Sequence, residues 1–134
     1  MNFHISLPCT NIEETKKFYV ETLGAELGRS ANNWIDINLY ENQLTFNNSG
    51  KFKFKYPNYT FEKEILPSFH FGVILEEELW KELYDKLKTF KMISKTDFLT
   101  GKTGEHSSIF IKDPNGYVIE FKTFKKENAV FSTK

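Results

Sequence analysis

Three side chains that can bind a metal ion stand in similar positions within apolar runs of this sequence. His4 occurs in FHI, His70 in FHF and Glu120 in YVIEF. Because neighbouring residues of a strand point to opposite faces, each polar side chain is expected opposite its apolar neighbours. Two neutral imidazoles and one carboxylate on a common face suit a divalent transition metal, with coordination positions left for water and substrate.

Each of these residues, taken alone, has a simpler explanation. A polar residue in a short apolar strand more often faces solvent or hydrogen-bonds to a neighbour than binds a metal. For Glu120 an unpaired charge within the apolar run would cost several kcal/mol. The residues therefore leave three alternatives for Glu120: it faces solvent, it has a partner, or it holds a metal.

The elements that would position these side chains occur twice along the chain. In the first half, a strand in NFHISLP is followed by an amphipathic helix over 11–23 and two strands in NWIDINLY and NQLTFN. In the second half, SFHFGVIL precedes a helix over 77–90 and two strands within SSIFIKDPNGYVIEFKTF. Asn11 or Thr10 can cap the first helix. In this internal repeat, Thr45 takes the position of Glu120.

The repeat predicts one domain of two modules. Module 1 is expected over about 1–50, a connecting segment over about 51–65, module 2 over about 66–126 and a C-terminal tail over 127–134. The connecting segment is rich in lysine, aromatic residues and proline. That composition is compatible with binding of single-stranded nucleic acid, but an edge hairpin protected by lysines explains it more simply.

Charge and cysteine content restrict the partners and the compartment. The chain of 134 residues has 18 basic and 18 acidic side chains, so no charge excess favours nucleic acid or a membrane surface. No apolar stretch approaches the roughly 20 residues of a membrane span. The single cysteine, Cys9, cannot form an internal disulfide, and the N-terminus lacks signal-peptide features. We expect a cytoplasmic protein that binds neither nucleic acid nor membrane.

Four stretches carry a resemblance to a known family. FHISLPCTNIEETKKFYVETLGAELGRS, WIDINLYENQLTF, FHFGVILE and GKTGEHSSIFIKDPNGYVIEFK resemble the vicinal oxygen chelate superfamily, which includes glyoxalases, bleomycin resistance proteins and extradiol dioxygenases. The resemblance implies an α+β fold, in which two βαβββ modules form a cupped mixed sheet with helices outside. It also implies that His4, His70 and Glu120 bind one divalent metal ion (Fe, Mn, Zn or Ni), and that the chain forms a homodimer.

Departures from the patterns of related enzymes restrict the reaction. Glyoxalase I enzymes place a fourth ligand, usually a glutamate that also moves the substrate proton, where this chain has Thr45. A threonine hydroxyl cannot serve as that base near neutral pH, which argues against glyoxalase I activity. Fosfomycin resistance enzymes have an arginine after the last ligand, whereas the tail FKTFKKENAVF has only lysines. Extradiol dioxygenases share the ligand set but usually have two such domains.

Further residues are expected around the metal. His106 and Gln43 are candidate catalytic residues, His106 as a proton carrier because imidazole exchanges protons near neutral pH. A histidine on a surface loop is the simpler explanation for His106. Candidate substrate-binding residues lie on polar strand faces or beside His106; they are Trp34, Asp36, Asn38, Thr45, Asn47 and Glu105.

Two classes of function remain from the sequence. The first is a metal-dependent enzyme, dioxygenase-like or lyase-like, acting on a small metabolite that chelates the metal through adjacent oxygens. The second is a non-catalytic small-molecule-binding protein of the bleomycin resistance type. The fold alone cannot choose between them.

Overall fold

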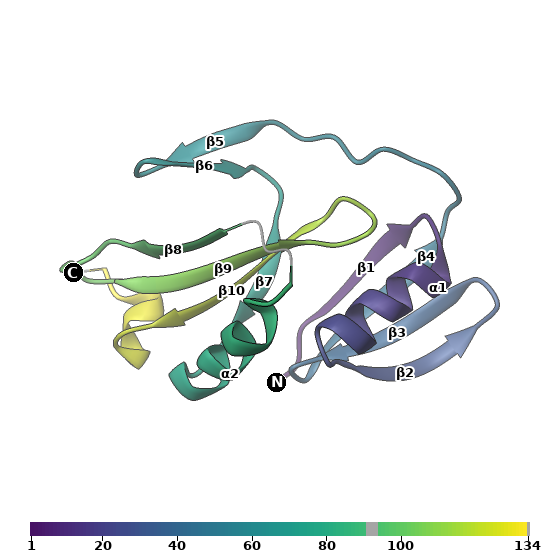
Figure 1. The fold of residues 1–134 in the computed structure, drawn as a ribbon, viewed down its shortest axis with the longest axis horizontal. Helices are drawn as coiled ribbons and strands as arrows, with labels where there is room; N and C mark the ends of the chain where they lie inside the picture. The colour runs from purple at the N-terminus through teal and green to yellow at the C-terminus, as the bar shows by residue number, and fades with distance from the viewer. Residues whose placement is uncertain (91–93, 134) are drawn as a thin grey trace. The chain divides into compact units, whose positions relative to one another are not determined.

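The computed structural model describes residues 1–90 and 94–133, and the chain forms two compact units (Figure 1). Unit 1 consists of Met1–Phe54 and Asp113–Gly116, and unit 2 consists of Lys55–Lys112 and Tyr117–Lys134. Each unit contains one four-stranded mixed sheet with the element order βαβββ. The expected α+β fold of two βαβββ modules is therefore confirmed.

Unit 1 places one helical segment against the apolar face of its sheet. Its elements are β1 (His4–Cys9), α1 (Ile12–Lys17), the π-helical turn Phe18–Thr22, β2 (Glu26–Ala31), β3 (Trp34–Leu39) and β4 (Asn42–Asn48). The strand order is β1-β4-β3-β2, with β1 parallel to β4. Asn11 caps α1, since its Oδ1 accepts a hydrogen bond from the Glu14 backbone N–H at 2.9 Å. Tyr19 packs on Phe46 with ring centroids 4.9 Å apart.

The turn between the last two strands of the chain also belongs to unit 1. The Tyr19 hydroxyl donates to Asp113 Oδ2 at 2.9 Å, and Asn115 Nδ2 donates to Thr15 Oγ1 at 3.1 Å. The backbone N–H of Thr10 donates to Asn115 Oδ1 at 2.8 Å. These polar side chains are largely buried, so the turn is held to the α1 segment by satisfied hydrogen bonds.

Unit 2 repeats the arrangement and adds a hairpin. Its elements are β5 (Asn58–Phe61), β6 (Glu64–Pro67), β7 (Phe71–Ile74), α2 (Glu77–Leu87), β8 (Ser94–Phe98), β9 (His106–Lys112), β10 (Val118–Phe124) and the 3-10 helix Glu127–Phe131. The sheet order is β7-β10-β9-β8, with β7 parallel to β10. Helix α2 buries Trp80, Leu83 and Leu87, and Trp80 Nε1 donates to the Phe121 carbonyl at 2.8 Å. Residue 134 of the expected tail lies outside the described residues.

The β5–β6 hairpin covers the face of the unit 2 sheet that carries Glu120. Leu66 joins a buried cluster with Phe98, Phe110 and Val118, against which Phe61 also packs. Phe110 stands opposite Glu120 in the β9–β10 register, so the apolar cluster lies on the same face as the carboxylate. The opposite face, with Phe121, contacts α2.

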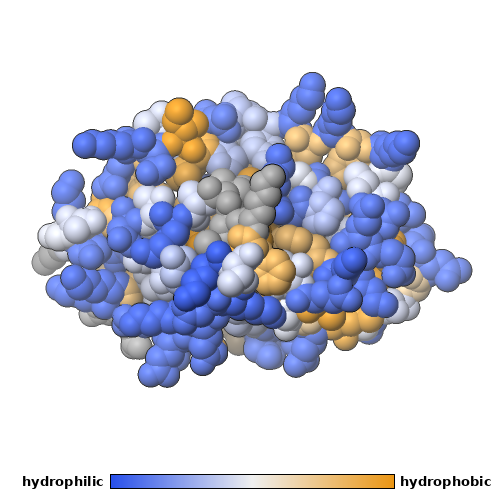
Figure 2. All heavy atoms as spheres, in the orientation of Figure 1, coloured by the Kyte–Doolittle hydropathy of each residue, from blue (hydrophilic) through white to orange (hydrophobic). Residues whose placement is uncertain are grey.

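Hydrophilic residues cover most of the surface in view, and apolar side chains form small patches between them (Figure 2). The most exposed large apolar side chains include Phe3, Ile65 and Phe131. Single apolar residues of this kind are normal on a protein surface. No helix within residues 1–90 and 94–133 has the length and apolar character needed to cross a membrane.

Gly72 allows β7 to approach the backbone of β10 at Glu120. These two residues are partners in the parallel register. A Cβ atom added at Gly72 would overlap the carbonyl oxygen of Glu120, and its next neighbours are also backbone atoms of Glu120. Because a backbone group cannot swing away as a side chain does, this position requires glycine.

We predict that Gly72→Ala lowers the free energy of unfolding by about 3 kcal/mol or more, because β7 must separate from β10. Urea denaturation measures the loss. Gly50→Ala is the control: a Cβ there meets no atom within 4 Å, and the φ of +72° adds only left-handed strain of about 1 kcal/mol. Equal losses in the two variants would contradict the close approach at Gly72.

Candidate functional site

His70 and Glu120 form a close pair in unit 2. His70 directly precedes β7, and its Nε2 lies 3.1 Å from Glu120 Oε1. The side chains are 18% and 11% exposed, respectively. Ser108 Oγ donates to the other carboxylate oxygen, Oε2, at 2.6 Å. Glu120 therefore has partners on both oxygens, and the solvent-facing alternative for this residue does not apply.

The second nitrogen of His70 determines what can lie between the ring and the carboxylate. The Pro67 carbonyl can only accept, so His70 Nδ1 carries a hydrogen and donates to it at 2.8 Å. In the neutral ring, the Nε2 lone pair then faces Glu120 Oε1. Two acceptors at this distance require a proton or a metal cation between them. Two atoms that each bind a metal at about 2.2 Å, with an angle of about 90° at the metal, are about 3.1 Å apart. The distance between His70 Nε2 and Glu120 Oε1 therefore fits two adjacent ligands of one metal ion.

The electrostatics of the pair favour an anionic carboxylate. The hydrogen bond to Glu120 raises the pKa of His70, against the opposing effect of burial. Burial by itself would raise the pKa of Glu120, but the hydrogen bonds from His70 and Ser108 outweigh it and lower that pKa. Lys122 acts in the same direction on Glu120. A metal would bind the charged carboxylate and the neutral imidazole, so it would take the place of the proton that the raised pKa of His70 favours.

Two aromatic rings flank the imidazole. The Tyr59 ring of β5 lies parallel to the His70 ring, with centroids 6.4 Å apart and an interplanar angle of 1°. The edge of Phe110 approaches from another direction at 5.9 Å. Apolar neighbours of this kind limit access of water and strengthen electrostatic interactions within the site.

The polar face of the unit 1 sheet carries most of the remaining predicted site residues. The register pairs His4 with Gln43 and Gln43 with Asn38 in one row, Ser6 with Thr45 and Thr45 with Asp36 in the next, and Asn47 with Trp34 in the third. Asn47 Nδ2 donates to Ser6 Oγ at 2.7 Å. The alternation of β3 and β4 thus places these polar side chains on one surface of the sheet.

Asp36 is the centre of this surface. Its Oδ1 accepts from the Thr45 hydroxyl at 2.6 Å, and its Oδ2 accepts from Arg29 Nε at 2.9 Å and Gln43 Nε2 at 3.1 Å. The residue is only 4% exposed. Burial alone would raise the pKa of Asp36, but the bonds from Thr45, Arg29 and Gln43 outweigh it and lower the pKa. Asp36 is therefore a fixed anion that orients its three donors.

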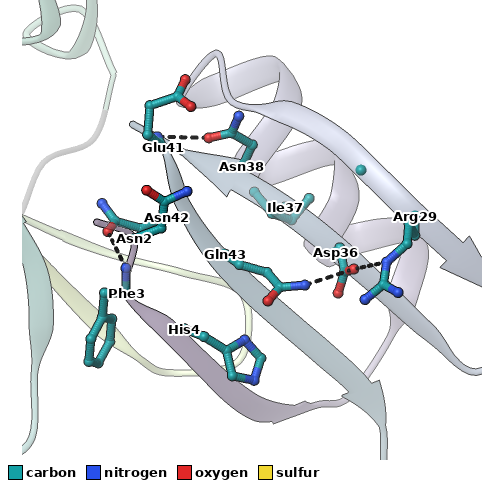
Figure 3. Close-up of a pocket in the computed structure, with 11 residues that line it drawn as sticks. Asn2, Phe3, His4, Arg29, Asp36, Ile37, Asn38, Glu41, Asn42 and Gln43 are labelled. Atoms are coloured by element: carbon teal, nitrogen blue, oxygen red, sulfur yellow. Dashed lines mark hydrogen bonds and ion pairs between the residues drawn. The ribbon is translucent and has the colours of Figure 1, made fainter.

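A pocket of about 380 Å³ opens on this face (Figure 3). His4, Arg29, Asp36, Asn38 and Gln43 contribute to its lining. Figure 3 shows Gln43 and Arg29 reaching Asp36 from opposite sides, with the His4 ring beside Gln43. A pocket of this volume with a few convergent polar groups suits a small ligand.

His106 and Glu105 lie at the start of β9. His106 is 9% exposed between the rings of Phe98 and Phe124, at 5.2 and 5.0 Å, and its Nδ1 donates to the Gly104 carbonyl at 2.8 Å. It is therefore an enclosed strand residue and not an exposed loop histidine. Glu105 Oε1 accepts from the backbone N–H of Gly101 at 2.8 Å, which closes the preceding loop. The catalytic role of His106 and the substrate-binding role of Glu105 stay predictions.

The predicted metal ligands divide between the units. His70 and Glu120 meet in unit 2, whereas His4 belongs to unit 1. Within the described ranges, no group of three or more histidine, cysteine, aspartate or glutamate side chains gathers as a metal site. The structure thus brings two of the three predicted ligands together, and the metal-binding role of His4, His70 and Glu120 stays a prediction.

Three contributors to these sites were not found from the sequence. Ser108 shares the strand face of Phe110 and could have been found from the alternation of β9. Tyr59 lies in the hairpin between the modules, where no pattern connected it with His70. Arg29 is the only arginine in the chain, which singles it out by type, but its contact with Asp36 depends on a register shift in the β2–β3 pairing.

The fold and the paired polar strand faces define a two-module βαβββ protein. Over residues 3–121 the sequence matches the model of the Glyoxalase/Bleomycin resistance protein/Dioxygenase superfamily. The chain belongs to this superfamily, as the resemblance implied. It matches none of the curated protein sequences with which it was compared.

Solved structures show the same fold at low sequence identity. A glyoxalase/bleomycin resistance protein/dioxygenase from Alicyclobacillus acidocaldarius is 23% identical, with a TM-score of 0.82 over 98% of this chain and 96% of that one. A genomically encoded fosfomycin resistance protein from Listeria monocytogenes is 15% identical, with a TM-score of 0.65 over 95% of both chains. A lactoylglutathione lyase from Agrobacterium tumefaciens is 14% identical, with a TM-score of 0.61 over 92% of both.

We predict that Asp36→Asn lowers the free energy of unfolding by about 2 kcal/mol at neutral pH, because it removes a buried anion that accepts three hydrogen bonds. The pKa of Asp36 is lower in the folded chain, so its ionised form stabilises the fold above the unfolded pKa. This stabilisation is lost as pH falls through the folded pKa.

Urea denaturation across a pH series tests this expectation. The difference in the free energy of unfolding between wild type and Asp36→Asn should become smaller as the pH falls below about 4. Asp85→Asn, at an exposed helical ion pair with Lys88, should leave the free energy nearly unchanged. If the two proteins differ in free energy of unfolding by the same amount at every pH, the pKa of Asp36 is not lowered in the folded chain.

Proposed function

We propose that this chain is a metal-dependent enzyme acting on a small metabolite that chelates the metal through adjacent oxygens. His70 and Glu120 would hold a divalent Fe, Mn, Zn or Ni ion, with His4 as the third ligand. The observation that carries the proposal is the distance of 3.1 Å between His70 Nε2 and a carboxylate oxygen of Glu120, with the other ring nitrogen of His70 bonded to the Pro67 carbonyl.

The neighbouring groups support this role. Ser108 and Pro67 orient the carboxylate and the imidazole from behind, as outer hydrogen-bond partners do for metal ligands. When bound, the ion would act as a Lewis acid that polarises the substrate oxygens. Tyr59 and Phe110 would limit entry of water beside His70. A two-histidine, one-carboxylate set leaves positions open for substrate.

Unit 1 would supply the groups that bind and orient the substrate. Trp34, Asn38, Asn47 and Thr45 share the polar face with Asp36. Thr45 donates to Asp36, and its hydroxyl is not a base near neutral pH, so the proposal excludes glyoxalase I chemistry at this position. Gln43 and His106 remain the candidate catalytic residues, Gln43 through its amide and His106 as proton carrier.

We also propose that the enzyme is a cytoplasmic homodimer. The lone cysteine, Cys9, is a buried free thiol, which is compatible with a reducing compartment. Light scattering at micromolar concentration should give twice the chain mass of 15.8 kDa. A mass of one chain would remove the oligomer from the proposal and leave the metal pair unaffected.

Metal content tests the enzyme proposal. Protein purified without an affinity tag should contain about one divalent ion per chain, and adding the right metal to stripped protein should raise the thermal midpoint. At a metal concentration 100 times the Kd, the stabilisation is about 2.7 kcal/mol. His70→Ala should lose both the metal and the gain in midpoint, with the helix-packed face unchanged.

His106→Gln is the control, because His106 is held by Phe98, Phe124 and Gly104 and not by the His70–Glu120 pair. It should keep the metal while slowing any proton transfer. If wild type binds none of iron, manganese, zinc or nickel, the non-catalytic binding function becomes the better explanation.

A further inference from the structure

Arg29 presents an oriented guanidinium group at the unit 1 pocket. Its Nε donates to Asp36 Oδ2 at 2.9 Å, and its Cζ lies 5.5 Å from the centroid of the Trp34 ring. Its side chain is 76% exposed, in contrast to the 6% exposure of the Asp36 side chain. A long flexible side chain is thus fixed at its inner nitrogen and supported by an aromatic ring, while its outer end stays accessible.

The two terminal nitrogens of Arg29 are available. No hydrogen bond joins them to any residue that the structure describes, whereas Nε is engaged. The end of the guanidinium carries two N–H bonds in a planar fork, which matches the two oxygens of a carboxylate. Figure 3 shows this end beyond the Asp36 contact, on the pocket lining.

Asp36 cannot turn away from this arrangement. The Thr45 hydroxyl and the Gln43 amide hold it in place, and its burial excludes competing water. Thr45 and Gln43 therefore act on the guanidinium through Asp36, as positioning residues. The contacts with Asp36 and Trp34 lower the entropy cost of ordering the Arg29 side chain on ligand binding.

We infer that this pocket binds the carboxylate group of a small ligand through the terminal nitrogens of Arg29. Arg29 is the only lysine or arginine in the pocket lining, so the pocket lacks the several cationic groups that suit a phosphate dianion. The carboxylates of Asp36 and Glu41 in the lining more than offset the charge of Arg29, so recognition depends on the planar fork and not on net charge. A lysine at position 29 could not reproduce it.

This inference gives the substrate class of the proposed enzyme as a small carboxylate. Its link to catalysis rests on the proposed function. The pocket volume of about 380 Å³ limits the ligand to metabolite size. His4 lines the same pocket, so a ligand anchored by Arg29 would extend beside a candidate metal ligand. The binding step itself requires no metal.

The test uses the full-length, metal-free protein labelled with ¹⁵N. A single arginine gives a single Nε–H signal, so the NMR spectrum reports directly on Arg29. Titration with sodium benzoate should shift this signal and the Trp34 indole signal in a saturable way, with a Kd near the millimolar range. Benzamide, which has the same shape without the charge, should bind at least about tenfold more weakly.

Substitutions test whether benzoate binding depends on the guanidinium group of Arg29. Arg29→Lys and Arg29→Gln should each weaken benzoate binding about tenfold or more, as followed at the Trp34 indole. Asp36→Asn should weaken it too, while the Arg29 signal moves toward that of a free side chain. Lys102→Gln, which removes a charge in unit 2, should bind benzoate like wild type.

The inference is overturned if Arg29→Lys binds benzoate as well as wild type does, or if benzamide binds equally. Tighter binding of inorganic phosphate than of benzoate would overturn the choice of carboxylate. Because the protein is metal-free throughout, these outcomes do not depend on whether His70 and Glu120 bind a metal.

Discussion

A carboxylate buried in a sheet must be compensated by hydrogen bonds and opposite charge, and each unit is organised around one such group. In unit 2 Glu120 accepts from Ser108 and faces His70. In unit 1 Asp36 accepts from three donors. Without these partners, burying either carboxylate would cost several kcal/mol. The hydrogen bonds therefore allow one face of each sheet to carry an anion while the other face packs in the apolar core.

The two carboxylates do not occupy equivalent positions in the repeat. Glu120 stands opposite Phe110, whereas at the matching place in unit 1 Thr45 stands opposite Asp36. The anion is thus on the last strand in one unit and on the preceding strand in the other. This shift changes the chemistry: unit 2 presents a carboxylate beside an imidazole, while unit 1 uses its carboxylate to orient donors. In the functions proposed above, unit 2 would hold a cation and unit 1 would bind an anion.

Strand alternation made much of this predictable from the sequence. It placed the Glu120 side chain on the other face of the strand from Ile119 and Phe121. The repeat of FHI and FHF indicated two modules. The residues alone gave one strand, one helix and two strands in each half; the third strands, β2 and β8, came only from the family resemblance. Both are edge strands, and their residues are largely polar or exposed, so they lack the apolar alternation that marks a strand. The contacts of Asp36 and Tyr59 depend on pairing between distant segments, which no local pattern contains.

The turn Asp113–Gly116 gives the chain an unusual order of assembly. Unit 1 includes this turn although its other residues end at Phe54, and the Tyr19–Asp113 bond joins residues 94 positions apart. During synthesis the first unit therefore stays incomplete until most of the second has left the ribosome. Contacts between residues so far apart in the sequence slow folding, because the chain loses the entropy of loop closure before these contacts stabilise it. A fragment ending at Phe54 would lack the hydrogen bonds that Asp113 and Asn115 make with Tyr19 and Thr15, so it would not contain the whole of unit 1.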